Sequence, residues 1–122
     1  MARLATVDAD GRPHLVPICF VLDADTLYSA VDSKPKRTAA LKRLENVRAN
    51  PRVAVLLDHY EDDWSHLWWV RLDGRARVVE DARERARALA LLGEKYEQYR
   101  AAPPGGPVLA VEIERLSGWA SV

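Results

Sequence analysis

The feature that most constrains the fold is the stretch of residues 67–78, along which apolar and polar side chains alternate. Side chains two positions apart on a β-strand share a face, so this pattern predicts one long strand with a core face and an outward face. The expected core face carries Trp68, Val70, Leu72, Gly74, Ala76 and Val78. The expected outward face carries Trp69, Arg71, Asp73, Arg75 and Arg77. An outward tryptophan beside an arginine indicates contact with a partner surface or a planar ligand; alternatively, Trp69 only caps the end of a barrel.

Three segments near the beginning of the chain, residues 4–7, 13–22 and 26–31, have the composition of strands and are separated by short turn sequences. Strands joined in this way predict an antiparallel meander. Pro13 and Pro17 cannot donate a hydrogen bond to a ladder, so part of the second strand is expected at a sheet edge or a bulge.

The rest of the chain adds two strands, residues 52–59 and 108–114, and two amphipathic helices, residues 38–50 and 80–100. Pro51 ends the first helix because the residue before a proline avoids the helical conformation. Six strands and two short helices in 122 residues predict a single domain, residues 1–122, that is mainly β with helices. The expected architecture is a small, closed antiparallel barrel of six strands.

The turn Asp32-Ser33-Lys34-Pro35-Lys36-Arg37, which leads into the first helix, is electrostatically unusual. A helix N-terminus carries about half a positive charge and favours acidic residues, yet three bases gather here. The second helix begins Glu80-Asp81 and follows the usual rule. Backbone N–H groups and clustered bases at a helix start form a site for a phosphate or carboxylate. The alternative is a solvated basic turn without a ligand.

The composition of the chain argues against several classes of protein. The chain has 18 basic and 18 acidic residues and a pI near 6.8, so it lacks the basic surplus expected of a nucleic-acid-binding protein. Its one cysteine, Cys19, excludes an internal disulfide and favours a reducing compartment, so we expect a cytoplasmic protein. No apolar run reaches the ~20 residues of a membrane-spanning helix.

No side chains suggest a metal or a nucleophile. The three histidines, His14, His59 and His66, lack the spacing of metal ligands, so we expect no metal site and interpret the proximity of His59 and His66 as chance. Cys19 lies in an apolar segment and is expected to be inert. No catalytic residue is predicted, and any reactive group is expected to come from a cofactor.

Several separated motifs resemble the split β-barrel flavin- and deazaflavin-binding proteins related to pyridoxamine 5′-phosphate oxidase. They are Gly11-Arg12-Pro13-His14-Leu15-Val16-Pro17 followed by Phe20, Leu27-Tyr28, Lys36 near a helix start, and Asn50-Pro51-Arg52-Val53. A second set resembles the branch of deazaflavin (coenzyme F-420)-dependent reductases. It comprises residues 32–37, Asp58-His59-Tyr60, Trp64-Ser65, residues 67–71, Asp73-Gly74, Tyr99-Arg100-Ala101, Pro103-Pro104 and Gly118-Trp119.

The resemblance implies a homodimeric split barrel with two cofactor sites at the subunit interface. The reduced deazaflavin would transfer a hydride to a small organic acceptor. Lys36 matches the residue that binds the cofactor phosphate. Its expected helpers are Ser33, Lys34 and Arg37.

The ring system of the cofactor is expected to contact other segments. The resemblance assigns its lining, largely through backbone groups, to Pro17, Ile18, Cys19, Ala30 and Val31. The neighbouring subunit is expected to contribute Trp69 and Arg71. Related chains carry a short helix before the first strand, which we expect to be absent here.

Three alternatives stay open. The cofactor could be FMN, because both cofactors present a phosphate to the same turn. The protein could bind a cofactor without catalysis, or it could be a structural dimer without a ligand.

Overall fold

The computed structural model describes residues 1–31 and 37–121, with the backbone alone described for residues 37–41. The strands are β1 (Ala2–Val7), β2 (Pro13–Ile18), β3 (Val21–Asp23), β4 (Thr26–Ala30), β5 (Arg52–His59), β6 (Trp68–Val78) and β7 (Val108–Ala120). The helices are α1 (Arg37–Ala49), the short 3-10 helix η1 (Trp64–His66), α2 (Ala82–Lys95) and α3 (Glu97–Ala101).

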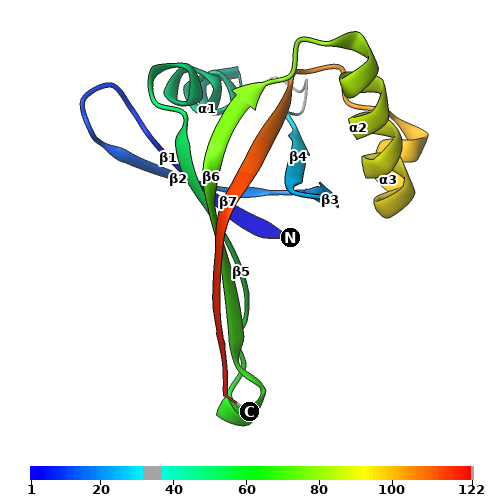
Figure 1. Ribbon diagram of the computed structural model, residues 1–122. Coiled ribbons are helices and arrows are strands. Elements are labelled where there is room, and N and C mark those ends of the chain that lie inside the picture. Colours follow the sequence, from blue (N-terminus) through cyan, green and yellow to red (C-terminus); the bar gives the residue numbers. More distant parts are fainter. Residues whose placement is uncertain (32–36, 122) are drawn as a thin grey trace.

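The strands form one antiparallel half-barrel sheet of seven strands, in the order β2-β1-β5-β6-β7-β4-β3. Helix α1 lies near the upper end of this sheet, while α2 and α3 lie together on one side (Figure 1). Strands β5, β6 and β7 extend away from the other elements as a long arm that carries η1 and the C-terminus (Figure 1).

The predicted strand of residues 13–22 is in fact two strands at opposite edges of the sheet. Strand β2 pairs with β1, β3 pairs with β4, and Cys19 and Phe20 join them. The expectations of six strands and of a closed barrel were therefore wrong: in the described residues, the two edges are joined through the chain and not by a ladder. The physical reason lies at Phe20, whose backbone groups are hydrogen-bonded by side chains and not by a neighbouring strand. Pro13 and Pro17 predicted an edge or a bulge, and they lie on the edge strand β2.

The alternation of residues 67–78 is confirmed for most of β6. Leu72, Gly74 and Ala76 are buried, whereas Arg71 and Arg77 on the opposite face are exposed. The pattern fails at the first residue of the strand. Trp68, which pairs with Ala120 at the end of β7, is 40% exposed.

Gly74 lies where the register between β6 and β7 shifts. A Cβ atom at this position would be inside van der Waals contact with the carbonyl oxygen of Glu112. The close approach of the two backbones therefore requires glycine, as is common where strands are irregular.

Helix α1 packs on the barrel through Leu44 and Val47, which belong to the core cluster inside the half-barrel. A buried hydrogen bond from Asn46 Nδ2 to Thr6 Oγ1, 3.0 Å long, fixes the helix against β1. The helix ends before Pro51, as predicted.

The predicted helix of residues 80–100 is broken at Tyr96. Asp81 caps α2 by accepting a hydrogen bond from Glu84 N, and Tyr96 takes an extended conformation between α2 and α3. A second core cluster joins this helix to the sheet, with Leu92 of α2 packed among Tyr28 and Ala110. The break directs the Tyr96 side chain to the crossover between β2 and β3, where its hydroxyl contacts Phe20.

Candidate functional site

Four of the residues expected to line the ring system gather at one cavity of about 190 Å³. Pro17 and Ile18 come from the end of β2, Cys19 follows them, and Ala30 ends β4. Val31, the fifth residue of that expectation, belongs instead to the buried core cluster. Its backbone N–H donates to the carbonyl of Pro107 at 2.8 Å. The structure thus brings two of the predicted segments, far apart in the sequence, to one place.

The remaining walls of this cavity are Met1, Arg43 and Tyr99. Arg43 is a residue that the sequence analysis missed. Its Nε atom is buried and has no hydrogen-bond partner, and burial lowers the pKa of its guanidinium. The available signal was helical spacing, since Arg43 precedes the buried Asn46 and Val47 by three and four positions and so shares their face.

A clamp built from α2 and its C-terminal flank holds the crossover beside this cavity. The hydroxyl of Tyr96 accepts from Phe20 N and donates to Phe20 O, both at 3.2 Å. Lys95 Nζ donates to the same carbonyl at 2.8 Å and lies 3.6 Å from the centroid of the Phe20 ring. Cys19 is adjacent, so the clamp also fixes one wall of the cavity.

Trp69 and Arg71 lie on the outward face of β6, as predicted, at a different depression. This second depression has a volume of about 320 Å³ and is also lined by Leu56, Asp58 and Tyr60. Across the sheet, Pro17 is paired with Arg3, Arg3 with Leu56, and Leu56 with Arg71. At roughly 4.8 Å per strand, Pro17 and Arg71 of one chain are separated by about 14 Å across the sheet.

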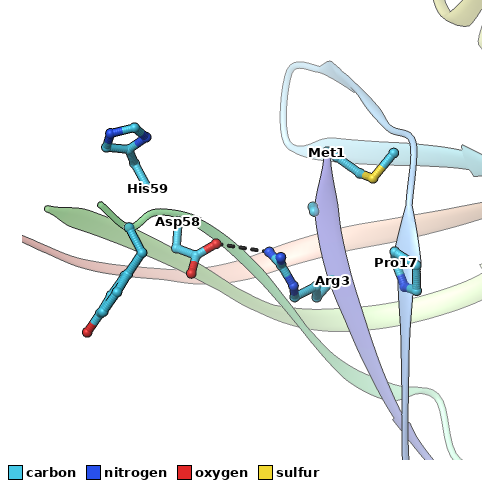
Figure 2. A pocket seen from close by; sticks show the side chains of 7 residues that line it. Met1, Arg3, Pro17, Asp58 and His59 are labelled. Carbon is cyan, nitrogen blue, oxygen red and sulfur yellow. Dashed lines mark hydrogen bonds and ion pairs between the residues drawn. The ribbon is translucent and has the colours of Figure 1, made fainter. Parts of the chain in front are cut away.

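Figure 2 shows the residues that line a third depression, which has a volume of about 360 Å³. It shares Met1 and Pro17 with the first cavity, and Asp58 and Tyr60 with the second. An ion pair spans it, from Arg3 Nη1 to Asp58 Oδ1 at 2.9 Å. The three depressions therefore lie next to one another along β2, β1, β5 and β6.

The predicted phosphate site falls mostly outside the described residues. Ser33, Lys34 and Lys36 are not among them, and Arg37 is described by its backbone alone. Helix α1 begins at Arg37 and has no acidic residue in its first turn. Helix α2 in contrast has Glu84 there, so the asymmetry between the two helix starts holds in the structure.

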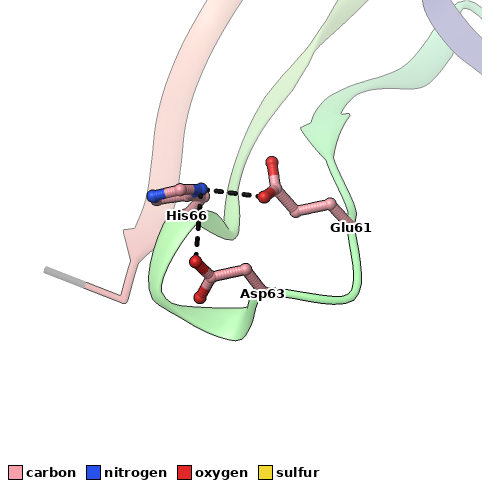
Figure 3. Close-up of side chains that lie close together, drawn as sticks. All are labelled: Glu61, Asp63 and His66. Atoms are coloured by element: carbon pink, nitrogen blue, oxygen red, sulfur yellow. Dashed lines mark hydrogen bonds and ion pairs between the residues drawn. The ribbon is translucent and has the colours of Figure 1, made fainter.

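A cluster of histidine and acidic side chains lies at the tip of the arm (Figure 3). Glu61 contacts both His59 and His66, the latter at 2.8 Å, and these hydrogen bonds, with His59 the larger cause, lower the pKa of Glu61. Glu61, Asp63 and His66 each offer a ligand atom, and these atoms lie within 4.8 Å of one another. All three are exposed, and their contacts with one another lie within the segment that joins β5 to β6. The expectation of no metal site stays a prediction.

No helix among the described residues is both long enough and apolar enough to cross a membrane.

Comparison with solved structures shows the same fold in proteins of different function. A FAD-binding protein from Mesorhizobium loti is 27% identical, with a TM-score of 0.71 over 96% of this chain and 83% of that chain. The heme storage protein from Vibrio cholerae is 21% identical, with a TM-score of 0.75 over 98% of this chain and 84% of its own. At that identity the likeness concerns the fold alone.

Over part of its length, the chain is similar in sequence to a curated enzyme. A 5a,11a-dehydrotetracycline/5a,11a-dehydrooxytetracycline reductase from Streptomyces rimosus is 36% identical over 56 residues. The match covers 46% of this chain and 38% of the reductase.

The half-barrel, the cavity beside its crossover and these likenesses agree with one further match. The family model described as pyridoxamine 5′-phosphate oxidase matches residues 1–120. The chain therefore belongs to the pyridoxamine 5′-phosphate oxidase family.

Proposed function

We propose that this protein is a deazaflavin (coenzyme F-420)-dependent oxidoreductase that transfers a hydride between the reduced cofactor and a small organic acceptor. The observation that carries the proposal is the cavity at the crossover, where Pro17, Ile18, Cys19 and Ala30 meet. These residues are the ones that the family resemblance assigns to the ring system. The partial match to a reductase supports an oxidoreductase over a plain binding protein.

The residues of the cavity suit a redox cofactor with a planar, partly polar ring. Most of the wall is apolar, and Arg43 and Tyr99 add polar residues to it. When bound, the cofactor would supply the hydride donor and acceptor. Ile18 and Ala30 would exclude water from one face of the ring, and the turn at Lys36 would bind the phosphate. No carboxylate or imidazole is among the cavity-lining residues in the described part of the chain, so the walls serve binding and orientation.

The size of the cavity supports a site shared between two subunits. Its volume of about 190 Å³ lies below the ~300 Å³ of the smallest typical ligand pockets, so a single chain encloses only part of such a cofactor. We propose a homodimer in which Trp69 and Arg71 of the neighbouring chain complete the site. The separation of about 14 Å between Pro17 and Arg71 across one sheet favours a contribution from a second chain.

A flavin, FMN in particular, is the alternative cofactor. The likeness to a FAD-binding protein favours it, because that protein shares the fold over nearly all of this chain. A third possibility is a protein that binds a cofactor without catalysis.

Titration of the protein with coenzyme F-420 and with FMN, followed by tryptophan fluorescence, tests the cofactor. We expect F-420 to bind more tightly, since its oligoglutamate tail adds negative charge near Lys34 and Arg37. Tighter binding of FMN would overturn this choice. Turnover of an enone or quinone acceptor by the reduced complex would distinguish an enzyme from a carrier.

The substitution Lys36→Glu tests the phosphate site. A charge-assisted hydrogen bond contributes about 1.5–3 kcal/mol, and reversing the charge costs more, so we expect cofactor binding to be abolished while the fold is retained. Arg48→Glu is the matched control, because Arg48 is an exposed base in the last turn of the same helix. Unchanged affinity in Lys36→Glu would contradict the phosphate assignment.

A further inference from the structure

The depression on the outward face of β6 has the size and the rigidity of a small-molecule site. It is lined by Leu56, Asp58, Tyr60, Trp69 and Arg71, and its volume is about 320 Å³. Typical small-molecule pockets begin at ~300 Å³. Across the sheet, Asp58 is paired with Trp69 and Leu56 with Arg71, so these four side chains share one face of two neighbouring strands. Hydrogen-bonded strands hold such side chains more rigidly than loops do.

Two of the lining residues suit a flat molecule. Trp69 lies on the outward face of the sheet and is nevertheless partly buried. Its indole offers a flat apolar surface on which a planar ring stacks. Leu56 of β5 adds a second apolar side chain to the same depression. A planar ring is therefore the shape that the depression fits best.

Each charged group at the depression already has a partner of opposite charge. Asp58 accepts a hydrogen bond from Arg3 Nη1 at 2.9 Å (Figure 2), and Arg71 Nε donates to Asp73 Oδ2 at 3.2 Å. The two pairs sum to zero charge, so they offer no net attraction to an ion. No other described residue accepts a hydrogen bond from Arg71, so its two Nη groups are left to donate to an oxygen of a ligand.

The three arginines on this face of β6 differ in what they can bind. Both Nη groups of Arg77 are held by carboxylates of α2 and β7. Arg75 is paired with Glu114 at 3.4 Å and does not line the depression. Among the three, Arg71 combines a place in the depression with Nη groups that the described residues leave unused.

We propose that this depression is the site of the acceptor, and that it selects an uncharged, planar carbonyl compound. The carbonyl oxygen accepts a hydrogen bond from Arg71, and the ring stacks on Trp69. This inference rests on the proposed function. In the homodimer, the cavity at the crossover of one chain receives the ring of the cofactor, and the depression of the neighbouring chain receives the acceptor.

Calorimetric titration of the cofactor-free protein with chromone, an uncharged planar carbonyl compound, tests the proposal. Arg71→Met is expected to weaken binding by about fivefold or more, because a charge-assisted hydrogen bond is lost. Trp69→Leu is expected to weaken it by about threefold or more, because the stacking surface is lost. The matched controls are Arg75→Met, on the same strand face, and Trp64→Leu, an exposed tryptophan outside the depression. Both controls should leave the affinity within about twofold of the wild type.

Urea unfolding checks that each variant is folded. The Arg71 side chain is 46% exposed, so Arg71→Met is expected to fold like the wild type even if Trp69→Leu does not. Equal affinities of Arg71→Met and the wild type for chromone would overturn the proposal, as would a wild type that does not bind chromone.

Two comparisons test the character of the site. Chromone-2-carboxylate is expected to bind more weakly than chromone, because the charge-balanced depression does not compensate for the lost hydration of the carboxylate. Tighter binding of the carboxylate would overturn the preference for an uncharged acceptor. Saturation with oxidised F-420 is expected to leave chromone binding unchanged or stronger. Displacement of chromone by F-420 would overturn the acceptor site, because the depression would then hold the cofactor.

Failure of this inference can be told apart from failure of the proposed function. If the wild type binds F-420 or FMN but chromone binds independently of Arg71, the acceptor site is refuted while the proposed function stands. If the wild type binds neither cofactor, the proposed function fails, and the depression loses its role as an acceptor site even where chromone binds.

Discussion

Replacing Tyr96 with phenylalanine tests how the crossover between β2 and β3 is held. The substitution removes one hydroxyl that bonds both backbone groups of Phe20, each at 3.2 Å. The Phe20 carbonyl keeps its hydrogen bond from Lys95 Nζ at 2.8 Å, so only the N–H loses this partner. Phe20 is 7% exposed, which leaves little access for water to replace the hydroxyl.

The expected cost follows from that one N–H group. A buried donor left without an acceptor costs about 1–3 kcal/mol, so we expect the free energy of unfolding to fall by about 2 kcal/mol in Tyr96→Phe. For a chain of 122 residues, about 1 kcal/mol corresponds to about 4 °C, which gives a drop in Tm of about 8 °C. Because Cys19 lines the cavity next to Phe20, cofactor affinity should fall as well.

Urea unfolding at a fixed protein concentration measures the effect, since association with a second chain would make stability depend on concentration. Tyr60→Phe is the control: Tyr60 is 74% exposed, and its loss of a hydroxyl should change stability by less than about 0.5 kcal/mol. If Tyr96→Phe were no more destabilised than this control, the reasoning about the crossover would be refuted.

Two further predictions concern the scaffold. Gly74→Ala should destabilise the protein by about 1–3 kcal/mol, because the added methyl group meets the Glu112 carbonyl. Gly93→Ala is the contrasting case, because the nearest atom to its added methyl group would be 3.8 Å away. It should stabilise α2 by up to about 1 kcal/mol in the same urea assay. Arg77, through its hydrogen bonds, lowers the pKa of Glu84 from 4.5 to about 2, so the stabilisation from Glu84 is complete above pH 4.5 and is lost as the pH falls toward 2. In Glu84→Gln, the free energy of unfolding should therefore fall less between pH 4.5 and 2 than it does in the wild type. If urea unfolding shows the same fall in both proteins, this assignment is contradicted.

Local patterns in the sequence were sufficient for the faces of individual elements. The alternation around Leu72 identified the buried side of β6, and the prolines at positions 13 and 17 identified β2 as an edge strand. Helical spacing gave the position of α1 and its end before Pro51. Each of these inferences depends on residues two to four positions apart, whose relative directions are fixed by the backbone geometry of a strand or helix.

The residues of the candidate site could be predicted only in part from such local patterns. Resemblance drew attention to Ile18 and Ala30, but no local pattern shows that they share a cavity with Arg43. A base on a short helix is ordinarily solvated, and only the packing of α1 against the sheet reveals that one of its nitrogen atoms is buried.

The sequence by itself determined which segments are extended or helical and, for most of β6, which side is buried, because these depend on neighbours along the chain. The tertiary structure decided the order of the strands, the division of residues 13–22 between two edges and the break of the second helix at Tyr96. A pair of hydrogen bonds between Phe20 and Tyr96, which are 76 positions apart, connects the site of the division with the site of the break. Contacts at such separations exist only once the chain has folded, and they are the ones that shape the cavity.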